Sequence, residues 1–191
     1  MSSLGSMWPN LRPTEARIHV DSHFARQTIT RALLHVMESR RNAAARLIVL
    51  CIGTDRSTGD ALGPIIGTLL CDKQLPGLCV YGTLEQPVHA TNLREVITPL
   101  SAKQGDALVL AVDACLGKSE NIGVITVGTG SLRPGAGVNK ELPAVGDAYI
   151  TGVVNVGGFM EYFVLQNTRL YLVYRLAQTI ADGIEAFALA R

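Results

Sequence analysis

The chain alternates short apolar runs with stretches of helical periodicity, and this alternation restricts the folds open to it. The apolar runs are rich in β-branched residues and flanked by glycines, as buried strands are; they occupy residues 47–52, 78–81, 107–112, 122–127 and 149–156. Helical patterns cover residues 23–40, 61–71, 92–100 and 159–190. Strands separated by helices predict a mostly parallel sheet with helices on both faces, a three-layer α/β/α sandwich.

The length of the chain indicates the number of domains, and its charge disfavours some classes of partner. A chain of 191 residues suits one domain, and we expect a flexible segment over residues 1–14 followed by a single α/β domain over residues 15–191. The formal net charge of +1, with no basic cluster on one face, disfavours nucleic acid or an anionic membrane as a partner. No secretory leader or membrane-spanning run is visible, and the four cysteines form no Cys-x-x-Cys pair. We therefore expect a cytoplasmic protein with reduced, buried thiols.

Polar loops follow three of the predicted strands, over residues 53–60, 82–92 and 113–121. Because ligands of such sheets bind beyond the carboxyl ends of the strands, these loops should converge on one crevice. Asp60 ends the first loop, and Asp113 directly follows the apolar run 107–112. Two carboxyl groups from separate strands can share a proton, leaving one acid and one base for an attacking water. The structural alternative for Asp60 is a helix cap.

Other residues are expected to surround this pair. The predicted substrate-binding set is Gly53, Thr54, Asp55, Thr83, His89, Arg133, Lys140 and Asn155. Gly53 and Gly59 should permit turns, and Asp55 is a candidate third acid. Arg133 and Lys140 would attract acidic substrate groups or favour the ionised state of one aspartate.

The sequence offers few alternatives to the aspartate pair. Residues 128–141 are rich in glycine but lack the P-loop and dinucleotide-binding spacings, and no zinc-protease helix or serine-nucleophile motif occurs. Cys115 could act as a nucleophile with His89 as its base, although a small buried thiol is the favoured interpretation. Two aspartates and a distant histidine form a hard ligand set, so we expect no cofactor; the alternative is a divalent metal such as nickel at Asp60 and Asp113.

Five blocks of the chain carry a family resemblance. These blocks lie between residues 47 and 176 and resemble the YyaC-type sporulation proteins. In chain order they are CIGTDRSTGDALGP, YGTLEQPVHATNL, AVDACLG, RPGAGVNKELPAVGD and ITGVVNVGGFMEYFVLQNTRL. More distantly, GDALGP, VDA and RPGAGVNKEL are similar to segments of the germination protease GPR, in which an aspartate pair is proposed to degrade small acid-soluble spore proteins. Asp60 and Asp113 match those aspartates. Both families resemble the hydrogenase maturation endopeptidases, whose acids and histidine hold nickel.

The resemblance implies a phosphorylase/hydrolase-like fold and an Asp-dependent endopeptidase that acts on spore proteins in the forespore or spore core. The chain is much shorter than the germination protease and shows no clear pro-segment. Asp60 also stands where the nickel-dependent enzymes usually carry glutamate, and His89 lies in a different loop from their histidine. Two alternatives stay open: a metal-binding maturation-type endopeptidase, and a non-enzymatic sporulation protein that binds a peptide or partner in the same crevice. A protein or peptide is the expected partner, and self-association is left open.

Overall fold

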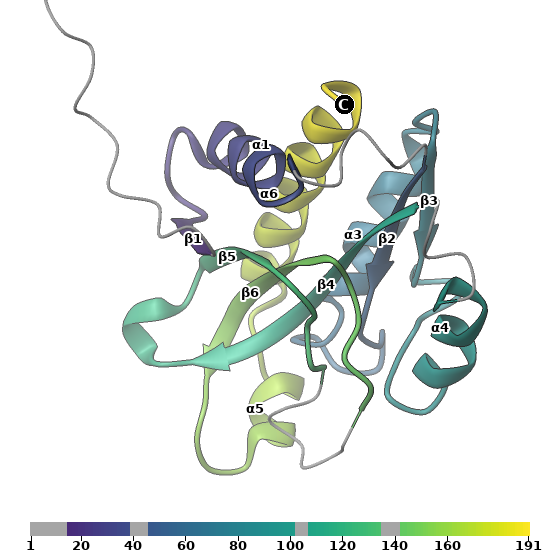
Figure 1. Ribbon diagram of the computed structural model, residues 1–191. Helices are drawn as coiled ribbons and strands as arrows, with labels where there is room; N and C mark the ends of the chain where they lie inside the picture. The colour runs from purple at the N-terminus through teal and green to yellow at the C-terminus, as the bar shows by residue number, and fades with distance from the viewer. Residues whose placement is uncertain (1–14, 39–45, 102–106, 135–141) are drawn as a thin grey trace, which may run out of the picture.

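The computed structural model describes residues 15–38, 46–101, 107–134 and 142–191. Their strands form one six-stranded sheet in the order β1-β5-β6-β4-β2-β3 (Figure 1). The strands are β1 (Glu15–His19), β2 (Arg46–Cys51), β3 (Leu78–Tyr81), β4 (Ala107–Gly117), β5 (Val124–Thr129) and β6 (Ala148–Val156). The helices are α1 (Ala25–Val36), α3 (Leu62–Asp72), α4 (Leu93–Ser101), the 3-10 helix η1 (Ser119–Asn121), α5 (Glu161–Gln166) and α6 (Leu170–Leu189).

The central strands bury side chains on both faces of the sheet, which explains their continuous apolar runs. In β2, Leu47 and Val49 pack with one hydrophobic cluster while Ile48 and Leu50 pack with the other. Helices α1, α3 and α6 cover the first face, and α4 covers the second together with residues around Leu132 and Val145 (Figure 1). The predicted three-layer α/β/α sandwich is confirmed.

The sheet is parallel in one half and antiparallel in the other. Strands β3, β2, β4 and β6 run parallel, whereas β5 is antiparallel to β6, and β1 is antiparallel to β5. Only residues 118–123 connect β4 to β5, which is too short for a crossover between parallel strands, since that takes about a dozen residues or more. The chain therefore reverses direction at this point.

Two elements differ from the sequence-based expectation. Strand β1 was not predicted, because only two of its five residues, Ala16 and Ile18, are buried. The single helix expected over residues 159–190 is divided into α5 and α6. The side chains of Asn167 and Thr168 bond back to the carbonyl oxygens of Phe163 (2.8 Å) and Val164 (2.9 Å), which favours a break. Among the residues described, no helix is both long and apolar enough to cross a membrane.

Two further expectations concern the cysteines and the N-terminal segment. All four cysteines are free, but Cys71 and Cys79 are exposed, so the expectation that all the thiols are buried was wrong. Cys79 lies on the edge strand β3, where alternate side chains face solvent. The predicted flexible segment 1–14 lies outside the described residues, and the division of the chain at residue 15 stays a prediction.

Candidate functional site

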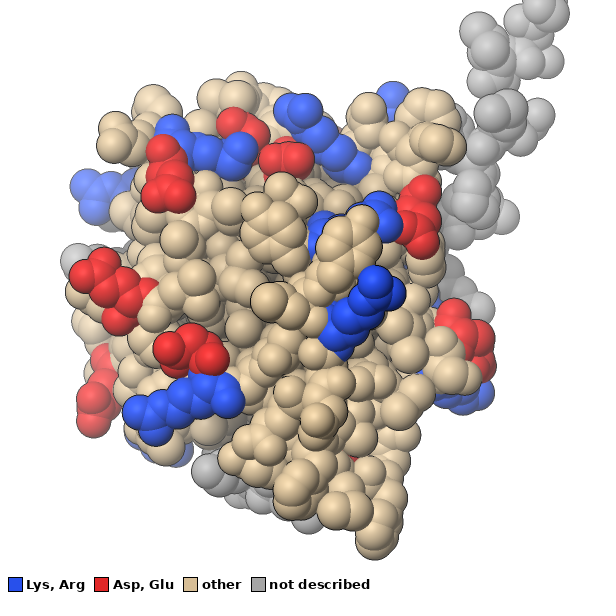
Figure 2. Space-filling model, turned by 180° about the vertical axis from the view of Figure 1, so that it is seen from behind, with Lys and Arg blue, Asp and Glu red and all other residues tan. Residues whose placement is uncertain are grey.

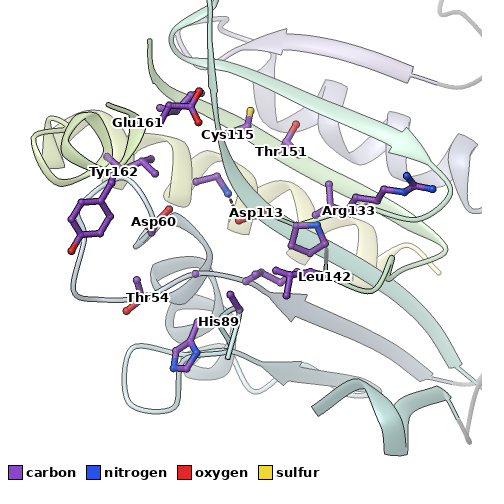
Figure 3. Close-up of a pocket in the computed structure, with 18 residues that line it drawn as sticks. Thr54, Asp60, His89, Asp113, Cys115, Arg133, Leu142, Thr151, Glu161 and Tyr162 are labelled. Atoms are coloured by element: carbon purple, nitrogen blue, oxygen red, sulfur yellow. Dashed lines mark hydrogen bonds between the residues drawn. The ribbon is translucent and has the colours of Figure 1, made fainter. Parts of the chain in front are cut away.

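A pocket of about 420 Å³ opens where β2 and β4 approach their carboxyl ends (Figure 3). Its lining comes from the loop after β2, the loop after β3, the second half of β4, residues 132–134, Leu142, Thr151 of β6, and α5. Six of the predicted site residues contribute to it: Gly53, Thr54, Asp60, His89, Asp113 and Arg133. The loops thus meet at one edge of the sheet, as ligand-binding loops of such folds do.

Asp113 lies inside β4 rather than after its end, because β4 continues to Gly117. Pairing between β2 and β4 ends at Cys51 and Val112, whereas pairing with β6 continues through Asp113 and Thr151. Asp113 is therefore the first residue of β4 beyond the end of β2, where the sheet opens toward the pocket. Its Oδ1 accepts a hydrogen bond from the N–H of Ala114 (2.8 Å).

The loop that carries Asp60 closes on itself through its backbone. The N–H of Thr54 donates to the carbonyl oxygen of Asp60 (3.2 Å), and the N–H of Gly53 donates to that of Val88 (2.8 Å). Gly53 has a positive φ of 147°, and a Cβ there would lie only 2.0 Å from the Asp60 carbonyl oxygen. Glycine is therefore required at position 53 for both conformation and space.

The Asp60 side chain is partly buried at the pocket wall (Figure 3). Burial raises the pKa of this carboxyl, while the neighbouring Ser57 hydroxyl lowers it to a lesser degree. Ser57 Oγ is itself buried and has no hydrogen bond of good geometry within the described part of the chain. The N-cap of α3 is Ala61, so the helix-cap alternative for Asp60 does not describe this helix.

His89 and Arg133 line the pocket in different ways. His89 is partly buried, and its Nδ1 lies 2.8 Å from Thr91 Oγ1. Arg133 is exposed, and in Figure 3 its guanidinium extends away from the two acids. Lys140 lies outside the described residues, so its predicted role stays a prediction.

Three predicted binding residues do not line the pocket. Asp55 is exposed in a turn. Thr83 Oγ1 accepts a hydrogen bond from the N–H of Gln86 (3.0 Å) within its own loop. Asn155 Nδ2 donates to Thr168 Oγ1 (3.2 Å) and, less closely, to the Val164 carbonyl oxygen (3.3 Å). The Asn155 side chain thus links β6 to the end of α5.

Sequence reasoning missed the contribution of α5, which brings Glu161, Tyr162 and Leu165 to the pocket. A signal was present, because β6 runs parallel to β4 and the residues after it must emerge at the same sheet edge. Treating residues 159–190 as one helix concealed this. Glu161 Oε1 accepts a hydrogen bond from the N–H of Gly158 (3.2 Å).

Cys115 also lines the pocket, but its environment disfavours the thiolate. Burial is the main cause that raises the pKa of Cys115, and the charge of Asp113 adds to it, although the Thr151 hydroxyl acts in the opposite direction. Because the thiolate is the nucleophilic form, these surroundings oppose the alternative in which Cys115 attacks the substrate.

The arrangement of the acidic, histidine and cysteine side chains bears on whether the site could hold a metal ion. Within the described ranges, no group of three or more His, Cys, Asp or Glu side chains is arranged to hold a metal ion. The two aspartates would supply hard oxygen ligands, which nickel, a borderline metal, does not prefer. We therefore derive no chemical step through a metal.

Comparison with known protein families shows which family the chain belongs to. The family described as "Protein of unknown function (DUF1256)" matches residues 17–183. The chain belongs to the DUF1256 family. A relative described as "Uncharacterized protein YyaC", from Bacillus subtilis (strain 168), is 50% identical over 167 residues, which cover 87% of this chain and 80% of the relative. The expected membership among YyaC-type proteins is thereby confirmed.

A solved structure shares the fold of this DUF1256 chain. It is the crystal structure of a [NiFe] hydrogenase maturation protease, HycI, from Thermococcus kodakarensis KOD1. The two structures align with a TM-score of 0.52 at 18% sequence identity, over 82% of this chain and 99% of the other. The expected structural relation to hydrogenase maturation endopeptidases is confirmed at the level of the fold.

Proposed function

We propose that this chain is a peptidase in which Asp60 and Asp113 hydrolyse a peptide bond of a polypeptide bound in the pocket. The observation that carries the proposal is that these two acids come from separate elements, the loop after β2 and strand β4, and line the same pocket. The fold shared with a hydrogenase maturation protease supports a hydrolase, although likeness of fold does not by itself determine activity.

The surroundings of the two carboxyl groups suggest different roles. Burial raises the pKa of Asp60, so we assign it the protonated state, in which it donates a hydrogen bond to the substrate carbonyl oxygen. Asp113 accepts the Ala114 N–H, so we assign it the ionised state, in which it acts as the general base.

The reaction then follows in two steps. Asp113 accepts a proton from water as the water oxygen bonds to the carbonyl carbon, giving a tetrahedral intermediate whose oxygen is stabilised by the proton of Asp60. The carbon–nitrogen bond breaks as the proton held by Asp113 passes to the leaving nitrogen. The products are a new carboxyl group and a new amine, and both acids return to their starting states.

We further propose that the substrate is a spore protein, such as a small acid-soluble protein, encountered in the forespore or spore core. The support for this is the resemblance of the blocks around Asp60 and Asp113 to YyaC-type sporulation proteins and to the germination protease. This finer proposal is separate from the peptidase proposal, because a different polypeptide could occupy the same pocket.

Product analysis tests the proposed function. Purified protein is incubated with a small acid-soluble spore protein and, separately, with a mixture of unrelated peptides, and mass spectrometry identifies the new termini. We expect cleavage by the parent and none by Asp113→Asn. Cleavage of the unrelated peptides alone would contradict the spore substrate, and cleavage of neither by the folded parent would contradict the peptidase.

Elemental analysis tests the metal-binding alternative. We expect purified protein to contain far less than one nickel or zinc per chain, because two aspartates alone provide few ligands for a borderline metal. One metal per chain, lost in Asp60→Asn, would overturn this expectation and favour a metal-dependent mechanism.

A further inference from the structure

Much of the pocket wall is formed by apolar side chains. Ile52, Leu116, Leu132, Leu142 and Leu165 all line it, and they come from five different parts of the chain. The volume of about 420 Å³ lies within the range of roughly 300–1,000 Å³ that is usual for small-ligand sites. The pocket can therefore enclose a side chain, and its walls favour an apolar one.

The charged groups of the pocket do not reverse this preference. Asp113 Oδ1 already accepts the N–H of Ala114, and Glu161 Oε1 accepts that of Gly158. Arg133 is exposed, so its charge remains in contact with water. An acidic side chain in the pocket would be repelled by the carboxylates. A basic one would be attracted by them, but it would lose its hydration against the leucines.

Helix α5 continues the apolar lining onto the outer surface. Phe159 is 90% exposed, and Met160, Tyr162 and Phe163 are each more than half exposed; we call these four residues the α5 surface. The rings of Tyr162 and Phe163 pack edge to face with 5.8 Å between centroids. Figure 2 shows that the projecting lower part of the molecule, at the level of α5 in Figure 1, is almost free of charged side chains.

Tyr162 joins the two features, since it belongs to the α5 surface and also lines the pocket. A group that fills the pocket therefore lies beside Tyr162, one of the four residues of the α5 surface. An extended chain can insert one side chain into a pocket and lay its neighbour on the rim, which the convex surface of a second folded copy cannot do.

We propose that the pocket and the α5 surface together bind an extended polypeptide, with a large apolar side chain in the pocket and a neighbouring apolar residue on α5. The inference rests on the proposed peptidase function in one respect, because it places the bond next to the enclosed side chain over Asp60 and Asp113. It assigns the substrate class of the site: polypeptides with a large apolar residue beside the cleaved bond.

The test uses blocked, fluorescein-labelled heptapeptides of serine and glycine that differ only at the central residue, which is Leu, Phe, Ala, Lys or Glu. Fluorescence anisotropy measures binding to the full-length protein, and mass spectrometry of the same samples measures cleavage. We expect the Leu and Phe peptides to bind at least about 10-fold more tightly than the Ala peptide. Tyr162→Ala should remove most of this preference. Tyr174→Ala, at a partly exposed tyrosine of α6 that does not line the pocket, should retain it.

Several results would overturn the inference: equal affinity for all peptides, tighter binding of the Lys or Glu peptide, no binding of any peptide, or a preference that Tyr162→Ala leaves intact. A dimer seen by light scattering that Tyr162→Ala dissociates and peptides do not would also overturn it, because a second copy would then cover α5.

The same experiment gives separate answers for the binding preference and for the proposed peptidase function. Preference for Leu and Phe without cleavage supports this inference and contradicts the peptidase. Cleavage without any preference at the central residue supports the peptidase and contradicts the inference.

Discussion

The N–H of Gly59 donates a hydrogen bond to the carbonyl oxygen of Leu165, with 2.9 Å between nitrogen and oxygen. Gly59 immediately precedes Asp60, and Leu165 belongs to α5 and lines the pocket. The contact therefore ties the loop that carries one proposed catalytic acid to the helix that forms the apolar rim. Gly59 does not have a positive φ; a Cβ there would lie 2.6 Å from Leu165 Cδ2, so the position requires space rather than a special turn.

Gly59→Ala should destabilise the protein by roughly 1–3 kcal/mol, because the added methyl must displace Leu165 or the loop. Chemical denaturation measures the change. The same substitution in a Leu165→Ala background is the control, and the penalty there should be smaller by at least about 0.5 kcal/mol, since contacting residues are coupled. An equal penalty in both backgrounds would show that Leu165 is not the obstacle.

The layers of the fold could be predicted because the central strands are buried on both sides. Strands β2 and β4 are apolar at every buried position, which separates them clearly from the amphipathic helices around them. The edge strand β1 has no such run, since Arg17 and His19 alternate with its two buried residues. Local periodicity therefore identifies the centre of the sheet better than its edge.

The site could be predicted where it depends on strand direction and not where it depends on a break within a helix. Asp60 and Asp113 were found because the carboxyl ends of parallel strands share one edge. Glu161 and Tyr162 were missed because the end of α5 is set by side-chain bonds from Asn167 and Thr168. These bonds reach only four residues back along the chain, but polar side-chain bonds leave little trace in hydrophobic periodicity.

The raised pKa of Asp60 predicts a pH dependence of stability. Because burial favours the neutral carboxyl, the folded protein binds more protons than the unfolded chain between about pH 4, the ordinary value for aspartate, and the higher pKa of folded Asp60. The stability associated with this group is present below that window and is lost as pH rises through it. Asp60→Asn should therefore become more stable relative to the parent as pH rises.

Denaturation midpoints measured from pH 4 to pH 8 test this. Asp55→Asn removes the same charge from an exposed position of the same loop and measures the general effect of charge. Parallel curves for the two variants across this range would mean that burial does not favour neutral Asp60.

Cys115→Ala should reduce peptidase turnover by no more than about twofold, because the partly buried thiol beside Asp113 resists ionisation and takes no part in the proposed reaction. Initial rates on one substrate measure the effect, with Cys79→Ala as a reference at an exposed cysteine. A loss as large as that of Asp113→Asn would instead support nucleophilic catalysis by Cys115.

Asn155→Ala should lower stability by roughly 1–3 kcal/mol, because buried Thr168 loses a hydrogen-bond partner and β6 loses its link to α5. Turnover per folded molecule should be unchanged. Thermal unfolding and active-fraction kinetics separate the two quantities. The opposite pattern, an unchanged melting temperature with a raised KM, would support the original assignment of Asn155 to substrate binding.

The most direct test of the account is a comparison of kcat/KM for the parent, Asp60→Asn, Asp113→Asn and Asp55→Asn on a single polypeptide substrate. Loss of either pocket acid should lower kcat/KM by about 10²–10⁴-fold, the usual contribution of general acid–base catalysis, while circular dichroism shows an intact fold. Asp55→Asn, outside the pocket, should retain the parent rate. If Asp60→Asn or Asp113→Asn cleaves the substrate as fast as the parent, the two aspartates are structural and the proposed mechanism is wrong.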